Sequence, residues 1–114
     1  MKERGSAGER IAAAFLERNG FRILEHNYRY GPGEIDLIAD DAGELVFVEV
    51  KLRRSRAYGP PEDAITTWKQ RTLRRTAEGY LFQHRIEDRP CRFDVVAIEG
   101  QGAAMEIRHL RNAF

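Results

Sequence analysis

Apolar residues recur along the first part of the chain at helical spacing. From Ser6 to Asn19 they return every three to four positions, which predicts an amphipathic helix, and Gly20 follows as its expected end. Ser6 and Glu9 have the spacing of a capping box, which explains Glu9 without any role in a site. Glu9 also lies in register with the apolar face of this helix. The alternative is therefore that Glu9 faces inward and lies near a metal site.

The pattern then changes to that of strands. Residues 21–30, 34–40 and 44–52 are rich in β-branched and aromatic residues. Gly31-Pro32-Gly33 separates the first two strands, and the turn around Asp41-Ala42-Gly43 makes the last two a hairpin. Both strands of the hairpin are apolar on both faces, as is typical of central strands covered by helices.

A second helix is predicted from Pro61 to about His84, with a break at Thr66-Thr67. Residues 91–98 and 104–110 are predicted as two further strands. The element order α-β-β-β-α-β-β predicts an α/β fold in which helices flank a mixed central sheet. The helical crossover between the third and fourth strands predicts that these two are parallel. The buried face of the second helix is expected to comprise Ile65, Trp68, Leu73, Ala77, Tyr80 and Leu81.

Composition narrows the class of protein. A chain of 114 residues with 42% hydrophobic and 32% charged residues is typical of one globular domain, residues 1–114. No apolar run approaches the ~18 residues of a membrane span, and no signal-like apolar segment follows the N-terminus, so we expect a cytoplasmic protein. The single cysteine, Cys91, excludes an internal disulfide, and the three scattered histidines argue against a zinc site.

Charge is distributed unevenly although the net charge is only +1. Residues 50–76 hold eight basic and two acidic side chains, a net charge of +6, so the rest of the chain carries −5. A basic segment of this kind favours a polyanionic partner such as nucleic acid. A solvated helix face joined to a loop is the alternative.

Charged residues also interrupt the two strands of the hairpin. If Asp40 faces Leu45, then Asp36 lies across from Glu49 and Glu34 lies across from Lys51, because side chains alternate along each strand. Opposed residues have Cβ atoms ~5 Å apart, so two ionised carboxylates would repel each other there.

Three arrangements would relieve this repulsion: a shared proton, an ion pair with Lys51, or a divalent cation. Oxygen ligands alone favour Mg²⁺ or Mn²⁺ over zinc. A buried polar network that only fixes the strand register is the alternative, although such networks are rarely more stabilising than apolar packing.

Four segments together resemble a known family: Gly33-Glu34-Ile35-Asp36-Leu37-Ile38-Ala39, Phe47-Val48-Glu49-Val50-Lys51, Arg92-Phe93-Asp94-Val95-Val96 and Arg111-Asn112-Ala113-Phe114. Over essentially the whole chain they resemble the YraN-like family of predicted endonucleases in the PD-(D/E)XK nuclease superfamily. The fold of that family is similar to that of archaeal Holliday junction resolvases. The resemblance implies a restriction-endonuclease-like αβββαββ core, with Ile35 in place of the motif's proline.

The resemblance implies roles for individual residues. Asp36 and Glu49 would bind Mg²⁺ or Mn²⁺ together with the backbone carbonyl of Val50, and Lys51 would orient the attacking water. Glu9 and Glu34 are the further carboxylates that could join the metal. Lys69 would approach either the site or the nucleic-acid backbone. Apart from the resemblance, the basic segment itself is expected to hold phosphates of the nucleic acid, through Arg53, Arg54, Arg56, Lys69, Arg71, Arg74 and Arg75.

The leading hypothesis is therefore a metal-dependent endonuclease that acts on DNA, with branched or otherwise structured DNA as one substrate class. A module of the same fold that binds nucleic acid without cutting it is the alternative, and a structural accessory protein is a third. By analogy with junction resolvases, the protein could also form a homodimer. Tyr58 either stacks on a base or closes its loop, and Arg92 and Asp94 are expected to form a structural ion pair.

Overall fold

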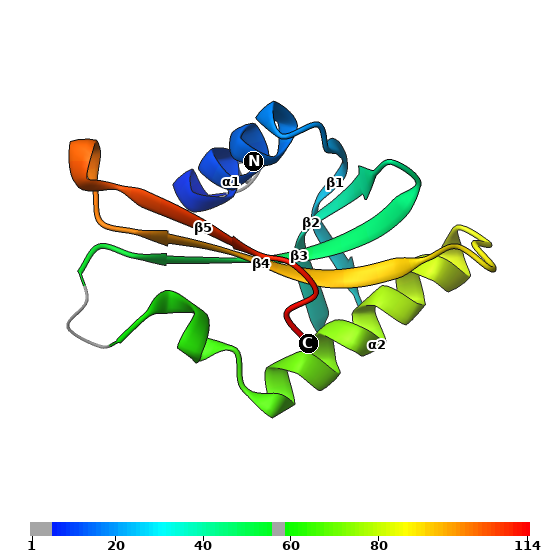
Figure 1. Ribbon diagram of the computed structural model, residues 1–114. Helices are drawn as coiled ribbons and strands as arrows, with labels where there is room; N and C mark the ends of the chain where they lie inside the picture. Colours follow the sequence, from blue (N-terminus) through cyan, green and yellow to red (C-terminus); the bar gives the residue numbers. More distant parts are fainter. Residues whose placement is uncertain (1–5, 56–58) are drawn as a thin grey trace.

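A five-stranded mixed sheet separates two helical layers (Figure 1). The structure is a computed structural model that describes residues 6–55 and 59–114. Neighbouring strands run in the order β1-β2-β3-β4-β5, and all pairs are antiparallel except the parallel pair β3–β4. The predicted class, the element order and the parallel pair are confirmed. The strands are β1 (Arg22–Tyr30), β2 (Gly33–Asp41), β3 (Glu44–Arg53), β4 (Cys91–Glu99) and β5 (Glu106–Leu110).

Helix α1 (Ala7–Arg18) covers one face of the sheet and begins as its sequence predicts. The Ser6 N–H donates to Glu9 Oε1 at 3.0 Å, and the Glu9 N–H donates to Ser6 Oγ at 3.3 Å. The capping box is therefore confirmed, and Gly20 has the positive φ of +90° expected after the helix. One carboxylate oxygen of Glu9 is thus engaged at the start of its own helix.

Helix α2 (Thr67–Gln83) covers the other face. A 3₁₀ turn, η1 (Pro61–Ala64), precedes it, and Thr66 caps it by accepting a hydrogen bond from the Lys69 N–H at 3.1 Å. The predicted break is confirmed. In the rest of the described chain, a second short 3₁₀ turn, η2 (Gly102–Ala104), connects β4 to β5. No helix among the described residues is long and apolar enough to cross a membrane.

The expected burial of Trp68 is wrong, because its side chain is 70% exposed. Leu73, Ala77 and Tyr80 form the buried face of α2. Trp68 precedes Leu73 by five residues, which places it about 140° away around a helix of 3.6 residues per turn. The sequence pattern therefore identified the helix correctly but included a residue from outside the buried stripe.

The core has two parts, one on each face of the sheet. The α2 side contains Ile35, Ile38, Leu45, Phe47, Leu73, Ala77 and Tyr80. The α1 side contains Ala12, Ala13, Leu16, Phe21, Leu37, Ala39, Val46, Val48, Val96 and Ile98. Strands β2 and β3 contribute to both parts, as predicted for central strands.

The register of the β2–β3 hairpin is the predicted one, since Asp40 pairs with Leu45. The turn is shorter than expected because Asp41 and Glu44 also pair, which leaves only Ala42 and Gly43 between them. Both turn residues have positive φ, +52° and +99° respectively. This is the backbone conformation that a two-residue hairpin turn of type I′ requires.

At the open end of the hairpin, the side chains of β2 no longer alternate regularly between the two faces of the sheet. Ile35 and Ile38 both lie in the α2-side core, whereas alternation would place them on opposite faces. The paired residues of β2 and β3 end at Leu37 and Val48. The predicted placement of Glu34 across from Lys51 is therefore wrong: β2 is irregular around Asp36, and its pairing with β3 ends at Leu37 and Val48.

Two glycines allow the β1–β2 connection to press against α2. A Cβ atom at Gly79 would lie 2.3 Å from ring atoms of Tyr30, and one at Gly33 would lie 1.9 Å from Thr76 Oγ1. Both distances are shorter than any real Cβ contact. The close approach therefore depends on the absence of a side chain at these two positions.

We expect Gly79→Ala to lower the free energy of unfolding by about 1–3 kcal/mol, because the new methyl group overpacks the contact with Tyr30. Gly8→Ala is the matched control, since Gly8 is also helical and its added Cβ would lie 3.4 Å from Leu52. That control is expected to be neutral or stabilising by up to about 1 kcal/mol. Chemical denaturation measures both, and equal stability of the two variants would contradict the expectation.

Candidate active site

Asp36 lies where β2 and β3 stop pairing. Its Oδ2 atom accepts a hydrogen bond from the Val50 N–H at 2.8 Å. A carboxylate that bonds to a strand's backbone N–H lies at the strand edge rather than above the sheet. Its side chain thus occupies the gap that opens beyond the Leu37–Val48 pair.

Glu49 brings a second carboxylate to this gap. Its residue is only 4% exposed. Burial, the charge of Glu49 and a hydrogen bond between the two carboxyl groups together raise the pKa of Asp36 to about 8, against the lowering effect of the Val50 N–H. Two carboxyl groups thus face each other at close range, as the predicted register required.

Two lysines reach the same oxygen of Glu49. Lys51 Nζ lies 3.3 Å from Glu49 Oε2, and Lys69 Nζ of α2 lies 3.5 Å from it. The whole sequence contains only three lysines among its 19 basic residues, so two of the three meet at this carboxylate. A compact ammonium group suits a reacting centre better than the planar, always charged guanidinium that the chain uses elsewhere.

The other candidate carboxylates have different partners. Glu34 forms an ion pair with Arg29 of β1, 3.2 Å between Oε2 and Nη2. Glu9 caps α1, and its charge contributes only the smallest of the effects that raise the pKa of Asp36. Within residues 6–55 and 59–114, no cluster of three or more His, Cys, Asp or Glu side chains has the geometry to hold a metal ion.

The donor set nevertheless fits one kind of cation. Mg²⁺ is commonly held by one or two carboxylates, with waters and substrate phosphates completing its coordination. Asp36 and Glu49 provide two facing carboxyl groups, and the pKa of Asp36 is raised first by burial and then by the charge of Glu49, which a cation would offset. Mn²⁺ takes the same oxygen ligands. The expected third ligand, the carbonyl of Val50, belongs to the residue whose N–H already binds Asp36.

The predicted phosphate-binding residues are in varied surroundings. Arg54, Arg71 and Arg75 are exposed. The Arg74 guanidinium lies 4.9 Å from the ring centre of Phe93 and 5.6 Å from that of Phe114, so it packs against the C-terminal segment. Lys69 contacts Glu49, and Arg53 donates a hydrogen bond to the Leu52 carbonyl. Arg56 and Tyr58 lie outside the described residues.

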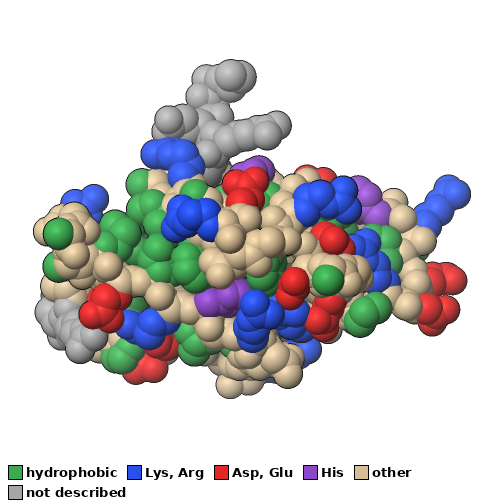
Figure 2. Space-filling view, turned by 45° about the horizontal axis from the view of Figure 1, so that its top comes forward, with side chains coloured by type: hydrophobic (Ala, Val, Ile, Leu, Met, Phe, Trp, Pro, Cys, Tyr) green, Lys and Arg blue, Asp and Glu red, His purple; other side chains and the backbone are tan. Residues whose placement is uncertain are grey.

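The two helical faces also differ in charge. Helix α2 carries Lys69, Arg71, Arg74 and Arg75 against Glu78, a net charge of +3. The α1 side, turned toward the viewer in Figure 2, shows basic and acidic side chains interspersed. The basic character that the sequence indicates is therefore concentrated along α2, whose Lys69 is also part of the carboxylate site.

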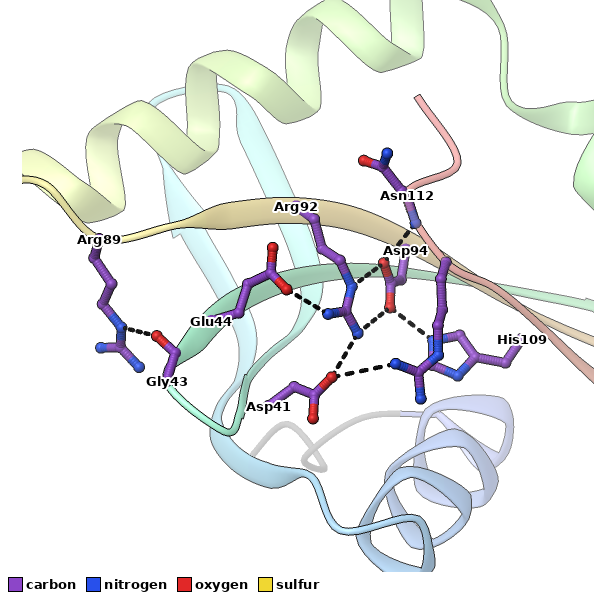
Figure 3. A network of polar contacts seen from close by, with 9 residues as sticks. Asp41, Gly43, Glu44, Arg89, Arg92, Asp94, His109 and Asn112 are labelled. Atoms are coloured by element: carbon purple, nitrogen blue, oxygen red, sulfur yellow. Dashed lines mark hydrogen bonds and ion pairs between the residues drawn. The ribbon is translucent and has the colours of Figure 1, made fainter.

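A second polar cluster lies at the other end of the hairpin and is centred on Asp94 (Figure 3). Arg92 Nε donates to Asp94 Oδ1 at 2.9 Å, which confirms the predicted ion pair. The same carboxylate binds His109 Nε2 at 2.7 Å and accepts from the Asn112 N–H at 3.0 Å. Sequence analysis missed these last two partners, because nothing local in the sequence indicates that β5 and the residues after it close over β4.

The Asp94 cluster extends to the hairpin. Arg92 also donates to Glu44 at 2.7 Å and to Asp41 at 2.9 Å, and Arg111 donates to Asp41 at 3.3 Å. With His109 of β5, these groups connect four strands, β2 to β5, and the segment after β5. The cluster is thus a clamp on the fold, separate from the carboxylate pair at the open end.

The sequence matches an uncharacterised protein family, UPF0102, over residues 8–98. It is similar to a UPF0102 protein of Symbiobacterium thermophilum, with 53% identity over 96% of this chain and 94% of the relative. A UPF0102 protein of Geobacter metallireducens is 46% identical over 99% of this chain and 93% of its own length. A third, from Pelobacter propionicus, is 49% identical over 96% of this chain and 81% of its own length.

Proposed function

Since the chain belongs to the uncharacterised protein family UPF0102, we propose its function from the candidate site: a metal-dependent endonuclease that hydrolyses phosphodiester bonds of DNA. One observation carries the proposal. The carboxyl groups of Asp36 and Glu49 face each other in a largely buried gap, with Lys51 and Lys69 on one oxygen of Glu49. This set supplies both a cation site and adjacent positive charge.

Hydrolysis of a phosphodiester needs a nucleophile in line with the leaving oxygen and neutralisation of the charge that develops on the phosphate. Asp36 and Glu49 would hold Mg²⁺ or Mn²⁺, which supplies Lewis-acid stabilisation of that charge when bound. Glu49 also holds Lys51 in place, so that Lys51 Nζ is available to orient the attacking water and to stabilise an anionic oxygen. Exposed arginines of α2 would bind the backbone on either side.

The site would be poorly explained as a structural feature alone. Burying two carboxylates beside each other destabilises a fold, and here it raises the pKa of Asp36 to about 8. The clamp around Asp94 already ties the strands together, so the carboxylate pair is not needed to fix their register. A functional requirement for the pair is the simpler explanation.

The test is cleavage of a supercoiled plasmid and a synthetic four-way junction by the purified full chain. We expect cleavage with Mg²⁺ or Mn²⁺, none in EDTA, and none by Asp36→Asn. Glu34→Gln is the matched control, since it removes a carboxylate two residues away that pairs with Arg29, and it is expected to cut like the wild type.

A binding readout accompanies the assay. Mg²⁺ should raise the melting temperature of the wild type and of Glu34→Gln but not that of Asp36→Asn, because a ligand of the native state stabilises it. Equal nicking by the wild type and Asp36→Asn would identify a contaminant and reject the proposal. Salt-sensitive DNA binding without cleavage would support the alternative, a nucleic-acid-binding module of the same fold.

A further inference from the structure

A pocket of about 320 Å³ lies between the β1–β2 connection and α2. Tyr30 and Pro32 line it on one side, and Trp68, Thr72, Arg75 and Thr76 line it on the helix. Its volume is near the small end of the ~300–1,000 Å³ range of ligand pockets. The close approach at Gly33 and Gly79 sets the spacing of its two walls.

The aromatic residues of this pocket are unusually exposed. Trp68 is 70% exposed and Tyr30 is 38% exposed, and they are two of the three large hydrophobic side chains that are exposed among the described residues. Exposing an indole ring forgoes the stabilisation that burying it would give. Arg75 adds a cation to the apolar lining. An aromatic surface next to a cation is the arrangement by which proteins bind the bases of single-stranded nucleic acids.

The pocket adjoins the candidate active site. Trp68 directly precedes Lys69, whose ammonium group contacts Glu49. On the other wall, Gly33 precedes Asp36 by three residues of β2, about 10 Å along a strand. A nucleic-acid strand with one phosphate at the carboxylate pair would therefore bring a neighbouring nucleotide to the pocket.

We propose that this pocket binds an unstacked nucleobase of the strand whose phosphodiester lies at Asp36 and Glu49. This inference rests on the proposed function and specifies its substrate class: DNA that is single-stranded or contains unpaired nucleotides at a branch. Bases inside a regular duplex are covered on both faces by their neighbours, so they cannot stack on Trp68 without being flipped out.

Charge favours nucleic acid over a second copy of the chain as the occupant. Helix α2, which supplies four of the lining residues, has a net charge of +3. Two copies that met through this helix would bring like charges together, whereas the phosphates of a DNA strand would neutralise them. Arg71 and Arg75 are exposed beside the pocket and available for that purpose.

Trp68 is the only tryptophan of the chain, so its fluorescence reports on this pocket alone. The probes are a single-stranded oligodeoxynucleotide and an abasic strand of the same length, titrated in EDTA so that no cleavage occurs. We expect the base-bearing strand to quench the fluorescence and the abasic strand to bind without quenching. Binding of the base-bearing strand with unchanged fluorescence would overturn the proposal.

The second measurement compares the affinities of the wild type and of two variants for a labelled DNA strand. Trp68→Ala is expected to weaken binding of the base-bearing strand by at least about five-fold, the low end of the effect of one stacked base. Binding of the abasic strand should not change. Phe82→Ala is the matched control, because Phe82 is 79% exposed at the other end of the same helix, and it should bind like the wild type. Equal affinities of the two variants for the base-bearing strand would overturn the proposal.

The outcomes separate this inference from the proposed function. Trp68-dependent binding without any metal-dependent cleavage would leave the base pocket supported and reject the nuclease. Asp36-dependent cleavage with binding that does not depend on Trp68 would reject only the base pocket. Self-association that Trp68→Ala abolishes, with no quenching by DNA, would identify a second copy as the occupant and overturn the inference.

Discussion

Replacing Asp94 with alanine is expected to lower the free energy of unfolding by about 3 kcal/mol. The Asp94 side chain is fully buried and binds Arg92, His109 and the Asn112 N–H (Figure 3). Removing one partner of a buried ion pair typically costs about 3–5 kcal/mol, because the remaining charge is left without compensation. The low end applies here since Arg92 keeps its bonds to Asp41 and Glu44.

Urea denaturation of the metal-free protein measures this change. Glu17→Ala, at an exposed position on α1, is the control and should alter the unfolding free energy by less than about 0.5 kcal/mol. If Asp94→Ala and Glu17→Ala were equally stable, the cluster would not be the clamp that its contacts indicate. If Asp94→Ala fails to fold, Asp94→Asn, which keeps the shape of the side chain, provides the measurement.

The effect of Asp94→Ala on the free energy of unfolding is also expected to depend on pH. Burial alone would raise the pKa of Asp94, but hydrogen bonds from His109, Arg92 and the Asn112 N–H outweigh burial and hold the pKa below its ordinary value. The stabilisation by a carboxylate with a lowered pKa is complete above the unfolded value of about 3.9 and is lost as the pH falls through the folded value. The stability difference between wild type and Asp94→Ala should therefore shrink below about pH 4.

Replacing Lys51 with alanine is expected to reduce the rate of DNA cleavage by about 10²–10⁴-fold, the usual contribution of a positioned acid–base group. Lys51 Nζ lies 3.3 Å from Glu49, so the ammonium group is held beside the proposed cation site. Single-turnover cleavage at saturating Mg²⁺ and DNA measures this loss. The Mg²⁺-induced rise in melting temperature should persist, because Asp36 and Glu49 remain.

Two further variants show whether Lys51 acts on the reaction or only on the fold. Lys51→Arg keeps the positive charge but replaces a compact ammonium group by a planar guanidinium, and we expect it to restore little of the rate. Lys69→Ala removes the other ammonium group at Glu49 and should weaken DNA binding more than it slows cleavage. Equal single-turnover rates for Lys51→Ala and the wild type would contradict this role for Lys51.

Local sequence signals were enough to predict most of the fold. The Ser6–Glu9 box, the turn around Asp41-Ala42-Gly43 and the break at Thr66-Thr67 each depend on residues within a few positions of one another. Such signals determine where elements begin and end and how a hairpin aligns. The correct register then placed Asp36 and Glu49 together, so the central pair of the candidate site was also predictable.

The failures arose where distant segments determine the structure. Trp68 is the exception, because its helical position about 140° from Leu73 already places it outside the buried stripe. Glu34 would lie opposite Lys51 only in a regular strand, whereas Ile35 and Ile38 show that β2 is irregular around Asp36. Contacts of Asp94 with His109 and Asn112 span 15 and 18 residues and have no local signature.

The clamp around Asp94 also constrains when the candidate site is completed during synthesis of the chain. Asp41 and Glu44, at the closed end of the hairpin, receive hydrogen bonds from Arg92 and Arg111, up to 70 residues later. A ribosome adds roughly 5–20 residues per second, so a nascent hairpin waits seconds for these partners. The strands that carry Asp36 and Glu49 are therefore fully held only after translation has passed residue 111.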